Sequence, residues 1–153
     1  DVGKVGQVVS VSKTDTFTTT STSLVALTGL TASITPTATS SKILVNVSIG
    51  AVDASGNIIV LFQLLRGATI IGSGDASGSR NRVMFKTILP SSNDAQASSN
   101  QFLDSPSSTS ELTYSIKTQC NQGTMYINRS SGDGDNTEYG RTVSTITLTE
   151  ILA

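Results

Sequence analysis

Two segments of the chain alternate between apolar and polar residues with a period of two. Over Ile43–Ile49, isoleucine and valine stand at every second position, and leucine, asparagine and serine stand between them. Over Glu111–Gln119, the residues Leu112, Tyr114 and Ile116 alternate with polar residues in the same way. Successive side chains of a β-strand point to opposite faces, so this period predicts two strands with one buried face each.

The segment Ile58–Arg66 is apolar on both faces until its final arginine. A strand of this kind lies centrally in a sheet or within a contact between copies of the chain. A sandwich strand in a monomer should leave one face polar unless another layer covers it, so the segment predicts a trimer.

Glycine, proline and clusters of small polar residues divide the remainder into short segments. The turns and loops expected there are Thr37–Ser41, Asp53–Asn57, Gly72–Ser79, Ser91–Gln101, Ser105–Ser110, Asn121–Gly123 and Ser130–Asn136. The further strands expected between them are Gln7–Lys13, Thr14–Thr20, Val25–Leu30, Thr31–Thr35, Ala68–Ile71, Asn81–Leu89, Thr124–Arg129 and Thr142–Leu152.

Strands at this close spacing predict an all-β fold, a two-sheet antiparallel β-sandwich of the jelly-roll type. Composition agrees, because serine and threonine account for 46 of the 153 residues and the chain is poor in helix formers. The length predicts a single domain spanning residues 1–153. Because the chain starts at Asp1 rather than Met, we expect a processed product or the C-terminal part of a longer chain.

Charge and the length of the apolar runs argue against two classes of partner. The net charge is −1, and Arg80 and Arg82 are the only basic residues that stand close together in the sequence. A nucleic-acid partner requires clustered cations that displace counterions from phosphates, so none is expected. Membrane insertion is not expected either, because no apolar run approaches the ~18 residues that a spanning helix needs.

Catalytic chemistry has little support in the residue types. The chain has no histidine, which excludes the usual triads and most catalytic metal sites. A polysaccharide depolymerase with two facing carboxylates stays open as the enzyme alternative, but the acids are spread over expected turns. The single thiol, Cys120, has no histidine to activate it. We therefore expect no enzymatic activity and no cofactor.

Two short motifs have a structural and a functional interpretation. Asp133–Glu138 resembles part of a calcium loop, but Ser144 stands where the twelve-residue pattern needs glutamate, so a plain loop is favoured. Asn46 and Asn128 each begin a glycosylation sequon, and both lie in or beside expected strands.

Two loops combine charged and hydrogen-bonding residues and are the candidate recognition surfaces. Loops on a rigid sandwich can vary without disturbing the core, and recognition tends to reside in them. Gly74–Arg82 and Ser130–Arg141 have the densest polar groups, and their side chains could converge if both loops lie at one end of the sandwich. In that arrangement Arg141 could instead pair with Asp133 or Asp135. The candidate residues are Asp75, Arg80, Arg82, Asp133, Asp135, Tyr139 and Arg141.

A series of short motifs covers nearly the whole chain. Each motif is low in complexity, but their order is specific. They are Gly3–Val9, Lys13–Ser23, Leu27–Leu30, Ser33–Pro36, Ser40–Val45, Leu65–Arg66, Gly74–Arg80, Phe102–Pro106, Leu112–Tyr114, Tyr126–Ser130, Tyr139–Arg141 and Ser144–Ile151.

In this order the motifs resemble a domain of tail-fibre and other appendage proteins of tailed bacteriophages, especially those of marine and cyanobacterial hosts. The resemblance implies a trimeric module on the virion surface at the end of a fibre. It implies three kinds of partner: copies of itself, other virion proteins, and a glycan or protein of the host cell surface. The expected function is host attachment by the fibre tip. A capsid decoration or head-fibre knob that binds only other virion proteins is the alternative.

Overall fold

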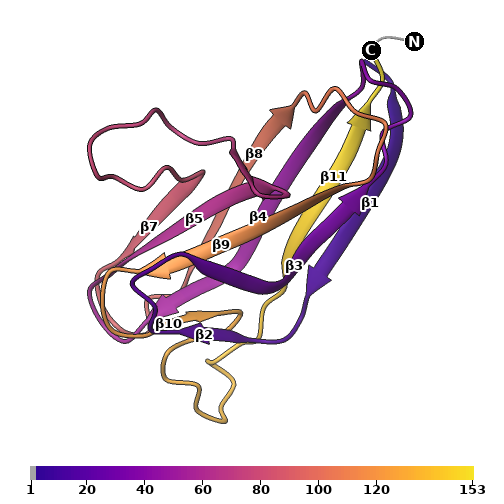
Figure 1. Ribbon diagram of the computed structural model, residues 1–153. Helices are drawn as coiled ribbons and strands as arrows, with labels where there is room; N and C mark the ends of the chain where they lie inside the picture. The colour runs from indigo at the N-terminus through magenta and orange to yellow at the C-terminus, as the bar shows by residue number, and fades with distance from the viewer. Residues whose placement is uncertain (1–2) are drawn as a thin grey trace.

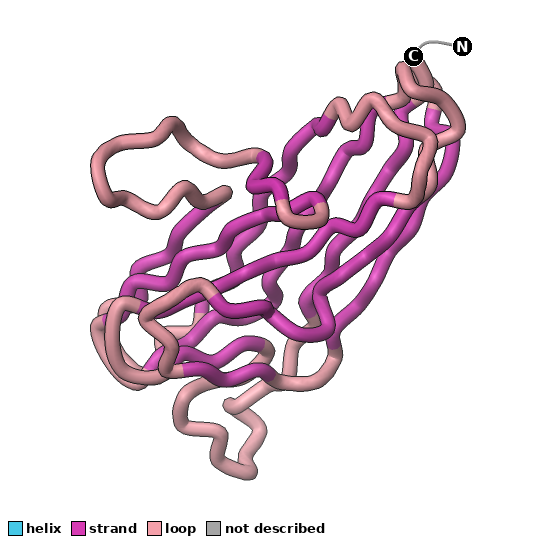
Figure 2. The backbone as a smooth tube through the Cα atoms, viewed as in Figure 1, coloured by secondary structure: helices cyan, strands magenta, loops and turns pink. Residues whose placement is uncertain are grey.

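Within residues 3–153, which the computed structural model describes, the chain forms strands and loops and no helix (Figures 1 and 2). No segment of this part is therefore a helix long and apolar enough to cross a membrane. The strands are β1 Val5–Lys13, β2 Phe17–Thr19, β3 Val25–Ile34, β4 Lys42–Ala54, β5 Ile58–Arg66, β6 Thr69–Ile71, β7 Phe85–Leu89, β8 Gln96–Asp104, β9 Leu112–Cys120, β10 Met125–Ile127 and β11 Ser144–Ile151.

The strands form two antiparallel sheets that pack face to face. The first sheet has the order β1–β11–β4–β8, and β10 and β2 extend it beside the last residues of β4. The second has the order β3–β9–β5, with β6 and β7 following one another along the far edge of β5. Consecutive strands repeatedly switch between the sheets, which is the jelly-roll arrangement. The predicted fold class is confirmed.

The alternating pattern of β4 sets one face of the core. Ile43, Val45, Val47 and Ile49 are fully buried, and the residues between them point outward. The strand continues past the predicted segment and bends at Gly50, where a Cβ atom would lie 2.2 Å from the Val143 carbonyl oxygen. Glycine is required there because the two backbones touch.

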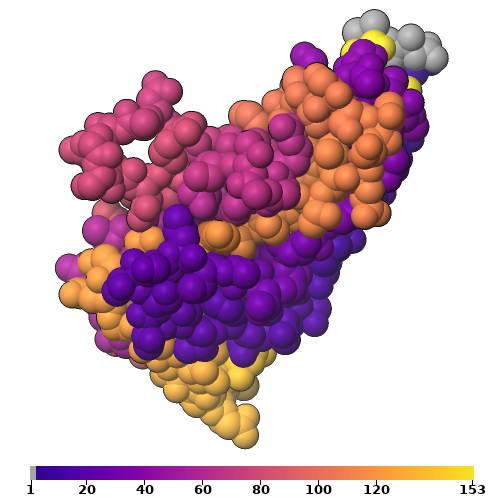
Figure 3. Space-filling model, viewed as in Figure 1, coloured from indigo at the N-terminus to yellow at the C-terminus, as the bar shows by residue number. Residues whose placement is uncertain are grey.

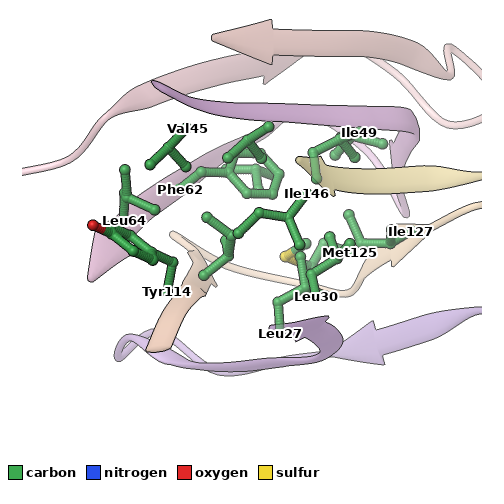
Figure 4. Close-up of a cluster of buried hydrophobic side chains, with 14 of the residues drawn as sticks. Leu27, Leu30, Val45, Ile49, Phe62, Leu64, Tyr114, Met125, Ile127 and Ile146 are labelled. Atoms are coloured by element: carbon green, nitrogen blue, oxygen red, sulfur yellow. The ribbon is translucent and has the colours of Figure 1, made fainter. Parts of the chain in front are cut away.

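Side chains from both sheets fill the space between the layers (Figure 4). From the second sheet, Phe62 and Leu64 of β5 and Tyr114 of β9 meet Val45 and Ile146 of the first. The space between the sheets is filled mostly by apolar side chains, and polar side chains lie mainly at its edges. The core therefore serves as a rigid support for the loops.

One edge of the core is closed by a partly buried ion pair between the sheets. Arg66 donates two hydrogen bonds to the Asp104 carboxylate, at 2.7 and 2.9 Å, and the Tyr114 hydroxyl donates a third at 2.8 Å. Burial and the neighbouring carboxylate raise the pKa of Tyr114 well above its usual value. Tyr114 therefore stays a neutral donor, and the three side chains join β5 and β9 to β8.

The apolar segment Ile58–Arg66 forms β5, which lies centrally between β9 and the β6–β7 pair. Its outward side chains include Ile59 and Leu61, which are half-buried, and Gln63, which donates a hydrogen bond of 2.7 Å to the Arg82 carbonyl. The chain thus covers part of this face with its own loop. The central position of β5 and its partial cover by the loop account for the apolar residues on both of its faces. Trimer formation stays a prediction.

The predicted loop Ser91–Gln101 is wrong in its second half, because β8 begins at Gln96. This strand pairs with β4 from Ile43↔Asp104 to Val52↔Gln96. Its side chains are mostly polar and exposed because it is an edge strand with solvent around it. The periodicity that marks half-buried strands is therefore missing from its sequence.

The bounds of other predicted strands differ in the structure, where strand pairing sets them. The predicted strand Thr14–Thr20 shrinks to β2, and Asn81–Leu89 shrinks to β7. Val25–Leu30 and Thr31–Thr35, predicted as two strands, form the one strand β3, whose register with β9 shifts around Gly29, which has φ +87°.

The start of β1 and the end of β11 lie at one end of the sandwich (Figure 1). The Gly3 amide donates to the Leu152 carbonyl at 2.6 Å, and the Leu152 amide donates to the Lys4 carbonyl at 2.8 Å. Lys42, the first residue of β4, pairs with Ile151 at this end. The 13 residues of β4 span ~40 Å to the opposite end.

Candidate recognition surfaces

The loop Ser130–Arg141 projects from the end of the sandwich opposite the termini (Figure 1). Its base is held by Asn128, which is fully buried in a left-handed conformation with φ 63°. The Asn128 amide group donates to the Lys13 and Asp15 carbonyls at 2.8 and 3.0 Å, and its oxygen accepts from the Ser144 hydroxyl at 2.6 Å. This sequon asparagine is a structural anchor that the folded chain does not expose to modification.

Two further residues fix the start of this loop. The buried Asp53 carboxylate accepts hydrogen bonds from the Ala54 and Ser131 amides, both at 2.7 Å. The Asn93 side-chain oxygen accepts from the Gly132 amide at 2.7 Å. Asp53, predicted to lie in a turn, is therefore a buried residue of β4 that orients the loop.

Inside the loop, Asp133 lies between two guanidinium groups. Arg141 pairs with one carboxylate oxygen, and Arg129 lies 3.2 Å from the other. The hydrogen bond from Arg141, with added attraction from Arg129, lowers the pKa of Asp133. The hydrogen bond to the Asp133 carboxylate raises the pKa of Arg141. Arg141 thus pairs with Asp133, one of the two partners considered from the sequence. Asp135 is exposed and lies outside this cluster.

The same contacts bear on the calcium-like motif. Asp133, its first residue, already has both oxygens occupied by cations. Among residues 3–153, no three histidine, cysteine, aspartate or glutamate side chains are grouped as they would be around a metal ion.

Tyr139 packs against the backbone of its own loop. A Cβ atom on Gly132 would lie 3.0 Å from the Tyr139 hydroxyl oxygen, and one on Gly134 would lie 3.1 Å from the Tyr139 ring. The ring is half-buried, so one side of it holds the loop together. Only the remaining surface is open to a ligand.

The second loop, Gly74–Arg82, is closed by fewer contacts. The Arg82 Nε donates to the Gly74 carbonyl at 2.9 Å, and Arg80 donates to the Ser77 hydroxyl at 2.9 Å. Asp75, Arg80 and Arg82 are all exposed.

The two loops do not converge. The end of Gly74–Arg82 contacts the outer face of the second sheet, where the Asn81 side-chain amide donates to the Gln119 side chain at 3.1 Å, and the rest of the loop projects outward (Figure 1). Figure 3 shows the two loops as separate projections of the surface. Arg80 and Arg82 therefore belong to one surface, and Tyr139 and Arg141 belong to another.

The arrangement of strands is also found in a virus. A chain in the structure of infectious bursal disease virus, Gx strain, is similar to this one with a TM-score of 0.50 and 11% identity, over 99% of this chain and 43% of that chain. The VP2 subviral particle of infectious bursal disease virus matches with a TM-score of 0.40 and 10% identity, over 95% and 41%. This chain spans less than half the length of either match.

At this level of identity the first match shows the fold, a jelly-roll-like sandwich, and nothing further. No family model matches the sequence, and no curated protein does. The resemblance to phage appendage domains stays a prediction.

Two cations of the second sheet were missed by sequence reasoning. Lys86 of β7 is opposite Leu61, and Lys117 of β9 is opposite Gln63. Each lysine alternates with buried residues along its strand, so the sequence pattern could have predicted that both point outward. Only the strand pairing brings them beside Arg82, whose carbonyl binds Gln63.

The buried ionisable groups of the described residues have structural partners. Burial opposes ionisation of Glu150, but the Thr37 amide, the Gln7 side chain and the Thr37 hydroxyl donate to it and lower its pKa to about 2. Burial raises the pKa of the Cys120 thiol, which favours its unreactive protonated form. In residues 3–153 no pocket is formed.

Proposed function

We propose that this chain is a structural protein of a virion, forming the tip domain of a fibre that attaches to the host cell surface. Two observations support a virion role: the jelly-roll-like fold shared with a chain of a virus, and the ordered motifs that resemble tailed-phage appendage proteins. On this proposal the chain is a single domain on the virion surface that binds without catalysis.

The observation that carries the proposal is the opposition of the termini and the loop Ser130–Arg141. A module joined to a fibre through its terminal end holds this loop outward, about the length of β4 away from the attachment point. The buried anchors Asn128 and Asp53 keep the loop in one conformation, which lowers the entropy that a contact must overcome.

Cell binding tests this proposal directly. The fluorescently labelled protein is incubated with a panel of marine and cyanobacterial strains, and binding is measured by flow cytometry. We expect binding to a subset of strains, and a loss of about tenfold when the exposed acids of the outward loop are removed as Asp135→Ala with Glu138→Ala. Glu111→Ala, an exposed acid outside both loops, is the matched control.

Binding to no strain at all would contradict host attachment. It would favour the alternative, a decoration or head-fibre knob that contacts other virion proteins.

Trimer formation is supported by the outer face of the first sheet. Over the central part of β1, β11, β4 and β8, the outward side chains form three rows without a charged residue, and Lys42 lies beyond them at the terminal end of β4. Burying such a face between copies avoids the desolvation of ions. One row is mostly apolar, and two are rich in hydroxyl and amide groups. The rows are Val8–Thr149–Leu44–Leu103, Ser10–Thr147–Asn46–Gln101 and Ser12–Thr145–Ser48–Ser99.

A charge placed on this face should dissociate the trimer. Leu103, which is 47% exposed, can accept glutamate without disturbing the core, and so can Ile88 on the other sheet, which is 51% exposed. In light scattering at micromolar concentration we expect a trimer for the unaltered chain and for Ile88→Glu, and a monomer for Leu103→Glu. A monomer before any substitution would count against the trimer, and dissociation by Ile88→Glu alone would move the interface to the second sheet.

A further inference from the structure

The outer face of the second sheet gathers four basic side chains from three separate segments of the chain. Arg80 and Arg82 come from the loop Gly74–Arg82, Lys86 from β7 and Lys117 from β9. In sequence, only the two arginines are close together. We call these four residues the basic patch.

Strand register places the two lysines on the same face. Lys86 alternates with Phe85, which stacks on Phe62 in the core with ring centroids 4.7 Å apart. Lys117 alternates with Ile116 and Thr118, which are buried. Both lysines therefore point away from the core, from the strands on either side of β5.

The end of the loop, Asn81–Arg82, lies between the two lysines. Gln63, which pairs with Lys117, donates to the Arg82 carbonyl at 2.7 Å, and Asn81 donates to Gln119 at 3.1 Å. Gln119 in turn is opposite Leu61, which pairs with Lys86. The backbone at Asn81–Arg82 thus lies over the part of the sheet that separates the lysines.

The patch stands out against the charge of the whole chain. Asp75 is the acid that shares its loop, so the patch with Asp75 has a net charge of +3, and the other six basic and ten acidic residues give −4. Within residues 3–153, none of the four cations takes part in a salt bridge. Their charge is available to a partner.

We propose that the basic patch binds an acidic polysaccharide. Between the cations lie the neutral amide groups of Asn81 and Gln119, which suit hydroxyl groups spaced between anionic ones. Single-stranded nucleic acid would favour exposed aromatic rings for base stacking, and Phe85 is turned into the core. The inference rests on the proposed function, because it adds a second contact with the host surface, separate from the loop Ser130–Arg141, and names the class of molecule bound there.

The patch also fits the proposed assembly. It lies on the second sheet, and the uncharged rows lie on the outside of the first, so a trimer formed through those rows leaves the patch accessible.

The test uses alginate, a polymer of uronic acids, with neutral dextran as the reference. We expect the protein to bind alginate and not dextran, with affinity that falls as salt rises. Lys86→Gln with Lys117→Gln should weaken alginate binding about fivefold, since each exposed ion pair contributes a small factor. The matched control is Lys4→Gln with Lys42→Gln, which gives the same net charge from two exposed lysines at the terminal end and should change binding less than about twofold.

Equal weakening by both double variants would overturn the proposal, because only overall charge would then matter. Tighter, patch-dependent binding of duplex DNA than of alginate would overturn it in favour of nucleic acid. Absence of alginate binding would also overturn it.

These outcomes are separable from those of the proposed function. Patch-dependent alginate binding without binding to any strain supports the inference and removes host attachment. Binding to cells that is unchanged in Lys86→Gln with Lys117→Gln leaves host attachment standing and removes the patch from it.

Discussion

The two loops that look alike in sequence are built in different ways. In Ser130–Arg141, many polar groups bind other groups of the same chain. Asp133 pairs with two arginines, and the base of the loop is held by Asn128 and Asp53. Gly74–Arg82 is closed by hydrogen bonds that its own arginine side chains donate, from Arg82 to the Gly74 carbonyl and from Arg80 to the Ser77 hydroxyl, and it leaves both arginines exposed. A high density of polar residues thus identifies a loop without saying whether the side chains hold the loop or face a partner.

This difference separates two kinds of candidate recognition surface. A loop with internal ion pairs presents a fixed shape, whereas a loop with free cations presents charge. The following changes test whether the first loop is rigid in a way that the second is not.

The largest effect is expected at the buried anchor of the first loop. Asn128→Ala removes hydrogen bonds to the carbonyls of Lys13 and Asp15 and to the Ser144 hydroxyl, leaving buried polar groups without partners. We expect a loss of about 3 kcal/mol in the free energy of unfolding, measured by urea denaturation. Asn57→Ala, at an exposed asparagine of the turn after β4, is the control and should change stability by less than about 0.5 kcal/mol. Similar values for the two would show that Asn128 is no anchor.

A smaller effect is expected from matched glycines in the two loops. In Gly132→Ala the new methyl group meets the Asn93 side-chain oxygen at 2.7 Å and the Tyr139 hydroxyl at 3.0 Å, whereas Gly74→Ala meets nothing within 4 Å. We expect a cost of about 1–2 kcal/mol for the first and less than about 0.5 kcal/mol for the second, in the same denaturation experiment. If Gly132→Ala proves as neutral as Gly74→Ala, Tyr139 does not pack on the loop.

The smallest effect is a pH dependence confined to the first loop. Because the arginines lower the pKa of Asp133, its pairing stabilises the loop above the usual range of aspartate and is lost as the pH falls through the lowered value. Amide exchange followed by NMR should show the Gly132 and Gly134 amides becoming less protected below about pH 3.8, relative to neutral pH. Asp133→Asn should show the weaker protection at every pH. An equal response at Gly74 and Gly78 would mean that acid loosens the whole chain.

The sequence predicted the parts of the fold whose burial is one-sided. Ile43–Ile49 and Leu112–Ile116 alternate because one face of each strand meets the core, and both segments are strands. The strand β8 was missed since its partner is the backbone of β4 and its side chains are mostly in solvent. Hydrophobic periodicity reports burial, and an edge strand is held by hydrogen bonds that leave no such signal.

The candidate surfaces were predicted as segments and not as arrangements. The pairing of Arg141 with Asp133 was foreseen as one possibility, because the two residues share a loop. Lys86 and Lys117 join the arginines through the register of β7, β5 and β9, which relates residues far apart in the chain. The hydrogen bond that the Ser131 amide donates to the Asp53 carboxylate likewise joins residues 78 positions apart in the sequence. Contacts of this kind depend on the completed topology.

The pairing of β1 with β11 has a mechanical consequence for the proposed role in attachment. β11 follows directly on the outward loop, and β1 runs beside it in the opposite direction, with partners from Val5↔Ile151 to Lys13↔Ser144. If the domain is tethered through its N-terminal side and pulled at the loop, tension passes from β11 to β1 along the strand axis. The hydrogen bonds of an antiparallel pair lie across that axis, so the load shears them together instead of opening them one after another. The domain should therefore resist a pull in this direction far better than one that peels β1 away from the sheet.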